Sequence, residues 1–106
     1  MQLTLEDDTI IAEPTKESLD ASLRTLRIPG CTFAVLDAQA DFYMQTARND
    51  DGSFVLEYQE GKLDQHYEVP YFVDIEDVIE AFSSFLAMDN KWREKFEWKK
   101  VEITPS

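Results

Sequence analysis

The stretch that decides the fold is residues 49–69, which read NDDGSFVLEYQEGKLDQHYEV. The turn-forming residues Asp50, Asp51 and Gly52 precede a segment in which apolar and polar side chains alternate, and a second turn at residues 60–62 precedes another such segment. Alternation with a period of two is typical of a β-strand with one buried face and one exposed face. The stretch therefore predicts two antiparallel strands joined by a short turn.

The two faces of these predicted strands differ in chemistry. The face expected to pack in a core carries Phe54, Leu56, Tyr58, Leu63, Gln65, Tyr67 and Val69. The opposite face carries Val55, Glu57, Gln59, Asp64, His66 and Glu68. This second face is largely acidic and holds the only histidine of the chain, so we expect whatever binds to it to decide the function.

Length and composition predict a single domain. The chain has 106 residues, enough to bury a core without disulfides, so we assign residues 1–106 to one domain. The only cysteine, Cys31, lies in an apolar run and is expected to pack as a small buried hydrophobe. No basic segment precedes an apolar run near residue 1, and no segment approaches the ~20 apolar residues of a membrane helix. These features favour a cytoplasmic protein with no membrane partner.

Charge is the strongest compositional signal. The chain has 22 acidic and 10 basic residues, and its net charge is −12. Residues 1–88 hold 18 acidic and five basic residues, whereas residues 89–106 hold four and five. A negative body repels the phosphates of nucleic acid and speeds the encounter with basic proteins. The charge therefore excludes nucleic acid as a partner, and it serves either to attract a basic protein or only to maintain solubility.

The segments before the central stretch predict further strands and one helix. Residues 2–12 predict a strand or short hairpin, and residues 16–27 a helix with one narrow leucine stripe. Residues 31–36 are almost entirely apolar and predict a strand covered on both faces. Residues 37–41 predict a turn, and the alternation in residues 42–47 predicts a half-buried strand. With the two central strands, these segments form an antiparallel meander.

Residues 74–88 give the clearest amphipathic helix of the chain. Asp74 and Asp77 favour a helix start at this point. The apolar stripe consists of Ile75, Val78, Ile79, Phe82, Phe85 and Leu86. The outer face consists of Glu76, Asp77, Glu80 and Ser84. Trp92 and Trp98 follow, and we expect this pair to close the edge of the core rather than to form a binding cage.

These elements together predict the fold class. We expect an α+β domain with an antiparallel meander sheet of four to six strands. The two main helices, residues 16–27 and 74–88, are expected to pack on one face of this sheet. The other face is then left open, with its acidic side chains exposed.

Motifs for catalysis, metal binding and nucleotide binding are absent from the sequence. No serine lies in a nucleophile frame, and the neighbours expected for His66 are carboxylates. One histidine and one cysteine cannot supply a structural zinc site, and the three glycines form no phosphate loop. We therefore predict no catalytic residues, no metal and no cofactor.

The predicted site is a surface for a protein partner. It consists of Tyr43, Gln45, Glu57, Gln59, Asp64, His66 and Glu68, with Glu76 and Glu80 at its margin. Tyrosine supplies contact area, and carboxylates accept arginine in a bidentate manner, so the surface suits a basic protein. The alternative is an ordinary solvated sheet face that binds nothing.

The sequence also resembles a known family. Residues 51–61 (DGSFVLEYQEG), residues 64–67 (DQHY), the acidic helix and the two tryptophans resemble small immunity proteins of bacterial polymorphic toxin systems, over about residues 31–103. The resemblance implies a cytoplasmic α+β protein that binds and blocks a cognate toxin domain, often a basic nuclease or deaminase. We expect a monomer or weak homodimer. The charge leads to a similar expectation independently, because a nuclease domain needs positive potential to hold its substrate.

Two other classes of function remain open at this point. An acidic secretion chaperone or adaptor would bind an extended effector segment along a sheet edge or a groove. It would form a stable homodimer and expose an apolar patch. A small enzyme would place a ligand-sized pocket around His66 and Tyr43.

Overall fold

The protein is built on one antiparallel sheet. The computed structural model describes residues 1–27, 30–39, 41–61 and 65–101. Within these residues seven strands pair in the order β2-β1-β3-β4-β5-β6-β7. The strands are β1 (Gln2–Leu5), β2 (Ile10–Ala12), β3 (Phe33–Gln39), β4 (Phe42–Arg48), β5 (Phe54–Glu60), β6 (His66–Glu68) and β7 (Lys99–Lys100). The helices are α1 (Lys16–Leu23), α2 (Ile75–Ala87) and α3 (Lys91–Lys95).

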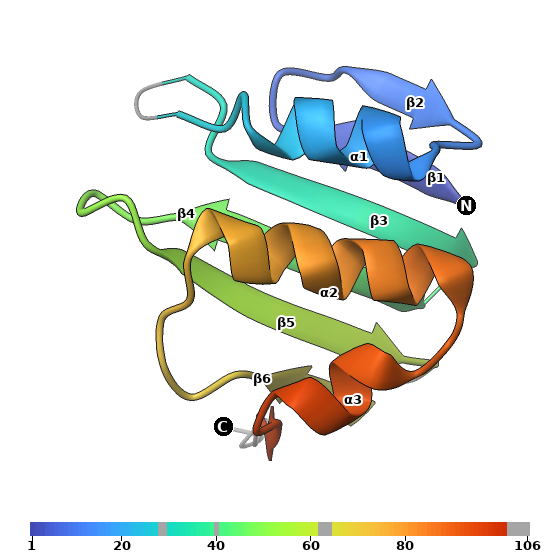
Figure 1. Ribbon diagram of the computed structural model, residues 1–106, viewed down its shortest axis with the longest axis vertical. Coiled ribbons are helices and arrows are strands. Elements are labelled where there is room, and N and C mark those ends of the chain that lie inside the picture. The colour runs from blue at the N-terminus through green and yellow to red at the C-terminus, as the bar shows by residue number, and fades with distance from the viewer. Residues whose placement is uncertain (28–29, 40, 62–64, 102–106) are drawn as a thin grey trace, which may run out of the picture.

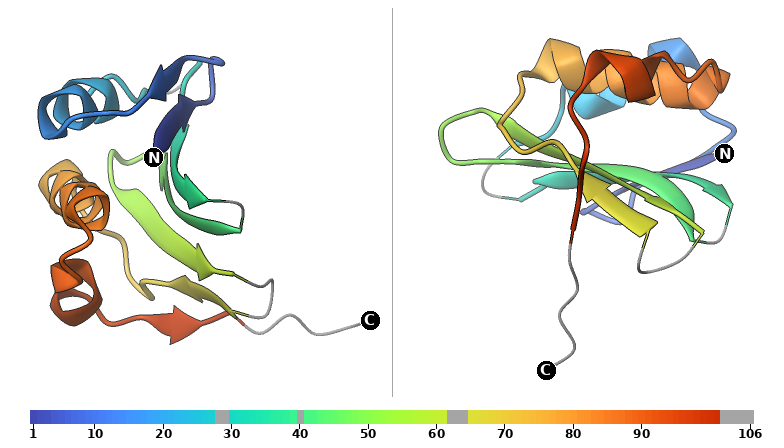
Figure 2. Two further views of the ribbon diagram at one scale, coloured as in Figure 1. Left: turned by 90° about the vertical axis from the view of Figure 1, so that its right-hand side faces the viewer. Right: turned by 90° about the horizontal axis from the view of Figure 1, so that it is seen from below.

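The helices and the sheet form two layers. α1 and α2 lie side by side across the sheet, and α3 lies near β6 (Figure 1). All three helices are on the same face, and the sheet curls toward them at both edges (Figure 2). We call the helices the helical layer and the opposite side of the sheet the open face. The predicted α+β class is confirmed, with seven strands in place of four to six, because both ends of the chain add short strands.

The core lies between the two layers. Leu3, Leu36, Met44 and Leu56 alternate along their strands toward the helices and are fully buried. From the other side α2 contributes Val78, Ile79, Ala81, Phe82 and Phe85. The rings of Phe42 and Phe85 meet edge to face, with centroids 5.2 Å apart. At about 1.5–3 kcal/mol for each large buried side chain, this contact between layers dominates the stability of the fold.

Helix α2 begins where the sequence predicts. Asp74 is the N-cap, its carboxylate accepts a hydrogen bond from the Asp77 amide at 2.9 Å, and Asp77 reaches back to the Asp74 amide. The predicted outer position of Ser84 is wrong. Ser84 is buried. Its hydroxyl is not left without partners, since it donates to the Asp89 carboxylate and accepts from the Trp92 amide at 3.1 Å. Ser84 therefore ties the end of α2 to α3.

The first helix is shorter than predicted. It ends at Leu23 rather than at residue 27, and the chain continues in two tighter turns in which the amides of Thr25 and Leu26 donate to carbonyls three residues earlier. Leu26 still reaches the core. The prediction that the leucine stripe faces the core is therefore confirmed, although the last leucine lies outside the helix.

Strand β3 corrects two predictions about residues 31–41. The strand extends to Gln39, so the turn is shorter than predicted. Its side chains also alternate between buried and exposed positions rather than being covered on both faces, because the helices cover one side of the sheet only. Phe33 is 41% exposed on the open side. Cys31, just before the strand, is buried as predicted.

Strands β5 and β6 of the central stretch pair antiparallel, as predicted. Gly52, with a φ of 89°, lies in the turn that precedes β5, where the Asp51 carboxylate accepts from the Ser53 amide at 2.9 Å. The second strand, β6, is shorter than predicted, and Leu63 lies outside the described residues. The two tryptophans close the core edge as predicted, because Trp92 is buried and its ring centroid is 5.6 Å from that of Trp98.

Candidate functional site

The register of the strands arranges the open face in rows of side chains. One row, read across the sheet, is Gln2, Asp37, Tyr43, Gln59 and His66. The next row is Thr4, Val35, Gln45, Glu57, Glu68 and Lys99. Six of the nine predicted site residues are in these rows, so the meander does bring them together.

At the centre of these rows lies a hydrogen-bonded polar cluster (Tyr43, Gln45, Glu57, Gln59 and His66). The Glu57 Oε2 accepts from Gln45 Nε2 at 2.8 Å and lies 2.7 Å from His66 Nε2. The Gln59 Oε1 accepts from the Tyr43 hydroxyl at 3.2 Å. Gln59 is only 5% exposed, and the His66 side chain is 14% exposed. The cluster is therefore a set of mutually fixed side chains rather than a loosely solvated surface.

The imidazole of His66 joins the two halves of this cluster. Nε2 lies 2.7 Å from Glu57 Oε2, to which it donates when it carries the ring proton, and Nδ1 lies 3.4 Å from the Gln59 carbonyl oxygen. A second ring proton would allow Nδ1 to donate there as well. In either form, the contact between His66 and Glu57 keeps the carboxylate in one orientation and leaves its second oxygen available.

Asp37 belongs to this face, although the sequence analysis placed it in a turn. Burial raises the pKa of the Asp37 carboxyl above its ordinary value. Burial also raises the pKa of Tyr43, with a further contribution from the nearby carboxylates of Glu57, Asp37 and Asp41. Tyr43 therefore stays a neutral hydrogen-bond donor. The alternation of Phe33, Val35 and Asp37 along one strand was the signal that would have found Asp37.

Carboxylates on the two sides of the molecule differ in their partners. On the helical side Glu76 pairs with Arg24 at 2.9 Å, and Glu60 pairs with Arg93 at 2.8 Å. Lys95 forms ion pairs with both Asp77 and Glu80. The open face carries the carboxylates of Asp37, Glu57 and Glu68. Among the described residues, no lysine or arginine forms an ion pair with any of them. Lys99 is the cross-strand neighbour of Glu68 but is not paired with it.

Exposed aromatic residues flank the polar cluster. Tyr71 and Phe72, the aromatic rim, follow β6 and are 47% and 63% exposed. A hollow of about 160 Å³ lies between this rim and the carboxylate-bearing strands, lined by Val55, Leu56, Glu57, Glu68, Val69, Pro70, Tyr71 and Phe72. The rim could not be predicted from the sequence, because residues 70–73 lie in an irregular segment with no periodicity. An exposed aromatic pair beside carboxylates is nevertheless typical of a contact surface.

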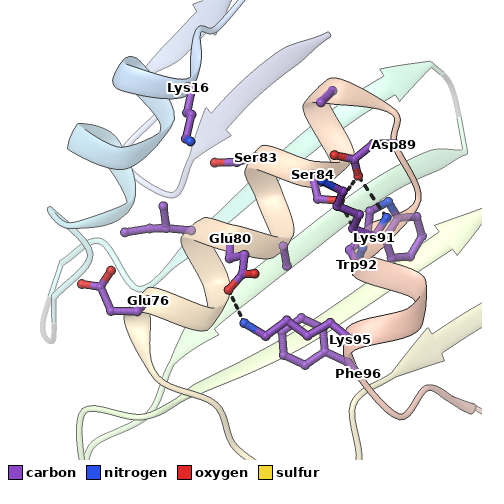
Figure 3. Close-up of a pocket in the computed structure, with 13 residues that line it drawn as sticks. Lys16, Glu76, Glu80, Ser83, Ser84, Asp89, Lys91, Trp92, Lys95 and Phe96 are labelled. Atoms are coloured by element: carbon purple, nitrogen blue, oxygen red, sulfur yellow. Dashed lines mark hydrogen bonds and ion pairs between the residues drawn. The ribbon is translucent and has the colours of Figure 1, made fainter.

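Three predicted site residues are not part of the described open face. Asp64 lies outside the described residues. The placement of Glu76 and Glu80 at the margin is wrong, because both are on the outer side of α2, which covers the other face of the sheet (Figure 3). The helix turns its apolar stripe toward the sheet and its acidic stripe away from it. These two residues therefore cannot share one surface with Glu57 and Glu68.

A separate hollow of about 520 Å³ lies over α2 and α3, with Lys16, Glu80 and Lys95 in its lining (Figure 3). Its acidic groups have partners within the chain. Glu80 pairs with Lys95, and Asp89 accepts from Ser84 and from the Lys91 amide. These hydrogen bonds lower the pKa of Asp89. The hollow therefore offers a partner little unpaired negative charge.

The remaining observations concern metals, membranes and relatives. In the ranges described above, no three histidine, cysteine, aspartate or glutamate side chains gather closely enough to hold a metal ion. No helix formed by the described residues has the length and apolar character needed to cross a membrane. Comparison of the chain with protein-family models, with curated proteins and with solved structures finds no match.

Proposed function

We propose that this protein binds a basic toxin domain through its open face and neutralises it by covering the active-site surface, as an immunity protein does. The observation that carries the proposal is the set of open-face carboxylates, Asp37, Glu57 and Glu68, which form no ion pair with a lysine or arginine of the described chain. Carboxylates are normally paired when they are partly removed from water. A cationic partner would pair these carboxylates.

The geometry of the polar cluster supports binding rather than turnover. Glu57 is held in place by Gln45 and His66, so its orientation is set before a partner arrives. A preorganised surface loses less entropy on association than a mobile one. The net charge of −12 also steers a basic domain toward the protein over long distances. The expected activity is stoichiometric inhibition, with no chemical change to the partner.

The direct test is a titration against a candidate toxin. A suitable candidate would be a basic carboxy-terminal domain of a large secreted protein, if a neighbouring reading frame encodes one. Its activity should fall linearly with added protein and reach zero at an equimolar ratio, and the association rate should fall as salt is raised. Full toxin activity in the presence of excess protein would refute the proposal.

A chaperone or adaptor for a secreted effector is the second candidate. The observation that favours it is the exposed apolar surface of Phe33, Tyr71 and Phe72. Such a protein binds an extended segment of its client without blocking any activity, and it is expected to be a stable homodimer. Light scattering distinguishes the two functions, because the immunity function predicts a monomer or weak dimer that becomes a one-to-one complex with the toxin.

A further inference from the structure

We infer that the open face accepts an arginine side chain of its partner in the hollow between Glu57, Glu68 and the aromatic rim. The inference rests on the proposed function for the identity of the partner as a basic protein, and it specifies the group that the partner inserts. The surface in question is the part of the open face lined by Val55, Glu57, Glu68, Tyr71 and Phe72.

The two glutamates face each other across neighbouring strands. Glu57 on β5 is the register partner of Glu68 on β6. Directly opposed like charges on a sheet are destabilising, because their side chains are adjacent. Gln45 and His66 both contact the same oxygen of Glu57, Oε2. The other oxygen and the Glu68 carboxylate remain available, and a cation placed between them would relieve the repulsion.

The shape and lining of the hollow favour arginine over lysine. A planar guanidinium donates to two carboxylates at once and stacks on aromatic rings, whereas an ammonium is a compact, strongly hydrated point charge. The hollow has both kinds of group, two carboxylates and the rings of Tyr71 and Phe72. Its volume of about 160 Å³ is below the roughly 300–1,000 Å³ typical of small-molecule sites, so it suits one side chain.

The chain contains the same arrangement in occupied form on its helical side. Arg93 pairs with Glu60, with an Nη2 to Oε1 distance of 2.8 Å. Its guanidinium carbon lies 4.4 Å from the ring centroid of Trp92 and 5.4 Å from that of Tyr58. A carboxylate and two aromatic rings thus hold one arginine within the fold. The open-face hollow offers comparable groups, and none of the described residues that line it is a lysine or arginine; Lys99, the register neighbour of Glu68, forms no ion pair with it.

The test is a binding titration of the whole protein, without any toxin, against three short peptides. Acetyl-Gly-Arg-Gly-amide is the probe, the lysine peptide has the same charge, and the citrulline peptide has nearly the same shape without the charge. Backbone chemical shifts are recorded by NMR at low salt, where surface charges are least screened. We expect the arginine peptide to shift residues around 55–57 and 68–72 and to bind at least about fivefold more tightly than the lysine peptide. The citrulline peptide should not bind.

Matched variants locate the site. Glu68→Gln and Phe72→Ala should each weaken arginine binding at least about threefold, from the loss of a charge-assisted contact or a stacking surface. Glu80→Gln removes the same charge as Glu68→Gln from the helical side and should leave the affinity unchanged. Circular dichroism confirms that all three variants are folded. Equal affinity for lysine and arginine, shifts confined to other residues, no binding of the arginine peptide, or its displacement by calcium would overturn the inference.

Failure of this inference and failure of the proposed function give different results. If the arginine peptide binds in the hollow but no toxin is inhibited, the proposed function is wrong and the arginine site stands. If toxin inhibition is stoichiometric but is unaffected by both Glu68→Gln and Phe72→Ala, the arginine site is wrong and the function stands.

Discussion

Carboxylates on the two sides of this sheet differ in the partners that they contact. On the helical side, Glu60, Glu76 and Glu80 each pair with an arginine or a lysine of the same chain. On the open face, Glu57 contacts an amide and an imidazole, and Asp37 has a pKa raised by burial. These three helical-side glutamates are therefore paired within the fold, whereas the open face carries negative charge that another molecule can neutralise.

This difference separates the residues that hold the fold together from the residues that are available for binding. Burial of apolar surface between the layers accounts for most of the stability. The open face contributes little of that burial and keeps like charges together at Glu57 and Glu68. Sites retained at some cost to stability are typical of functional surfaces.

The largest effect is expected in the core beneath the helical layer. Phe82 is fully buried on α2, so Phe82→Ala should reduce the free energy of unfolding by about 3–5 kcal/mol, through lost burial and the cavity left behind. Urea denaturation followed by circular dichroism measures this loss. Phe33→Ala on the open face is the matched control and should change stability by no more than about 0.5 kcal/mol. Similar losses for both variants would contradict the division into two faces.

The next effect concerns association with the toxin. Glu57→Lys combined with Glu68→Lys reverses two charges on the open face and should slow association at least about tenfold at low salt. Glu76→Lys combined with Glu80→Lys changes the net charge equally on the helical side. Stopped-flow mixing measures both rates. Equal slowing by the two double variants would mean that net charge, rather than the open face, controls the encounter.

A smaller effect is expected at the start of α2. The Asp74 carboxylate accepts a hydrogen bond from the Asp77 amide, and Asp74→Ala leaves this amide without its partner. The expected loss is about 1 kcal/mol of unfolding free energy, with toxin binding unchanged. Thermal denaturation and a toxin titration give the two values. A large loss of affinity would place the helical side in the binding surface.

The smallest effect is expected at Asp37, and its size depends on pH. Burial raises the folded-state pKa of Asp37, so the stability linked to its protonated form is present below its unfolded pKa, about 3.9, and is lost as pH rises through the folded value. Asp37→Asn should therefore stabilise the protein at pH 7 by ~0.5 kcal/mol or less, since solvent screens the partly exposed group, and the gain should vanish in acid.

Replacement of Asp89, on the helical side, is expected to change the stability in the opposite direction. Hydrogen bonds from Ser84 and the Lys91 amide lower its folded-state pKa, so its stabilising contribution is present above the unfolded value and is lost as pH falls through the folded one. Asp89→Asn should therefore destabilise the protein at pH 7. Denaturation curves of both variants from pH 3 to pH 7 check the pair, and the same sign for both would contradict the comparison.

The periodic parts of the chain were predictable from sequence, and the irregular parts were not. The hairpin around Gly52 and the helix capped by Asp74 follow from alternation, turn chemistry and capping, which act over a few residues. The position of Asp37 was missed because β3 continues past the apolar run, through a register shift before Gln39. Tyr71 and Phe72 were missed because irregular segments have no period.

The error about Glu76 and Glu80 has a different origin. Periodicity assigns both residues correctly to the outer face of α2. It does not state how that face is oriented relative to the open side of the sheet, which depends on the packing of the layers. Which carboxylates share a surface is therefore a property of the tertiary structure, and it decides which of them are candidates for the site.

Carboxyl footprinting of the protein, free and in complex with its toxin, tests the central claim most directly. A carbodiimide labels accessible aspartate and glutamate side chains, and mass spectrometry gives the labelling of each residue. We predict that the complex protects Asp37, Glu57 and Glu68 and leaves Glu76 and Glu80 labelled as in the free protein. Protection of Glu76 and Glu80, with the open-face carboxylates labelled as before, would contradict the account.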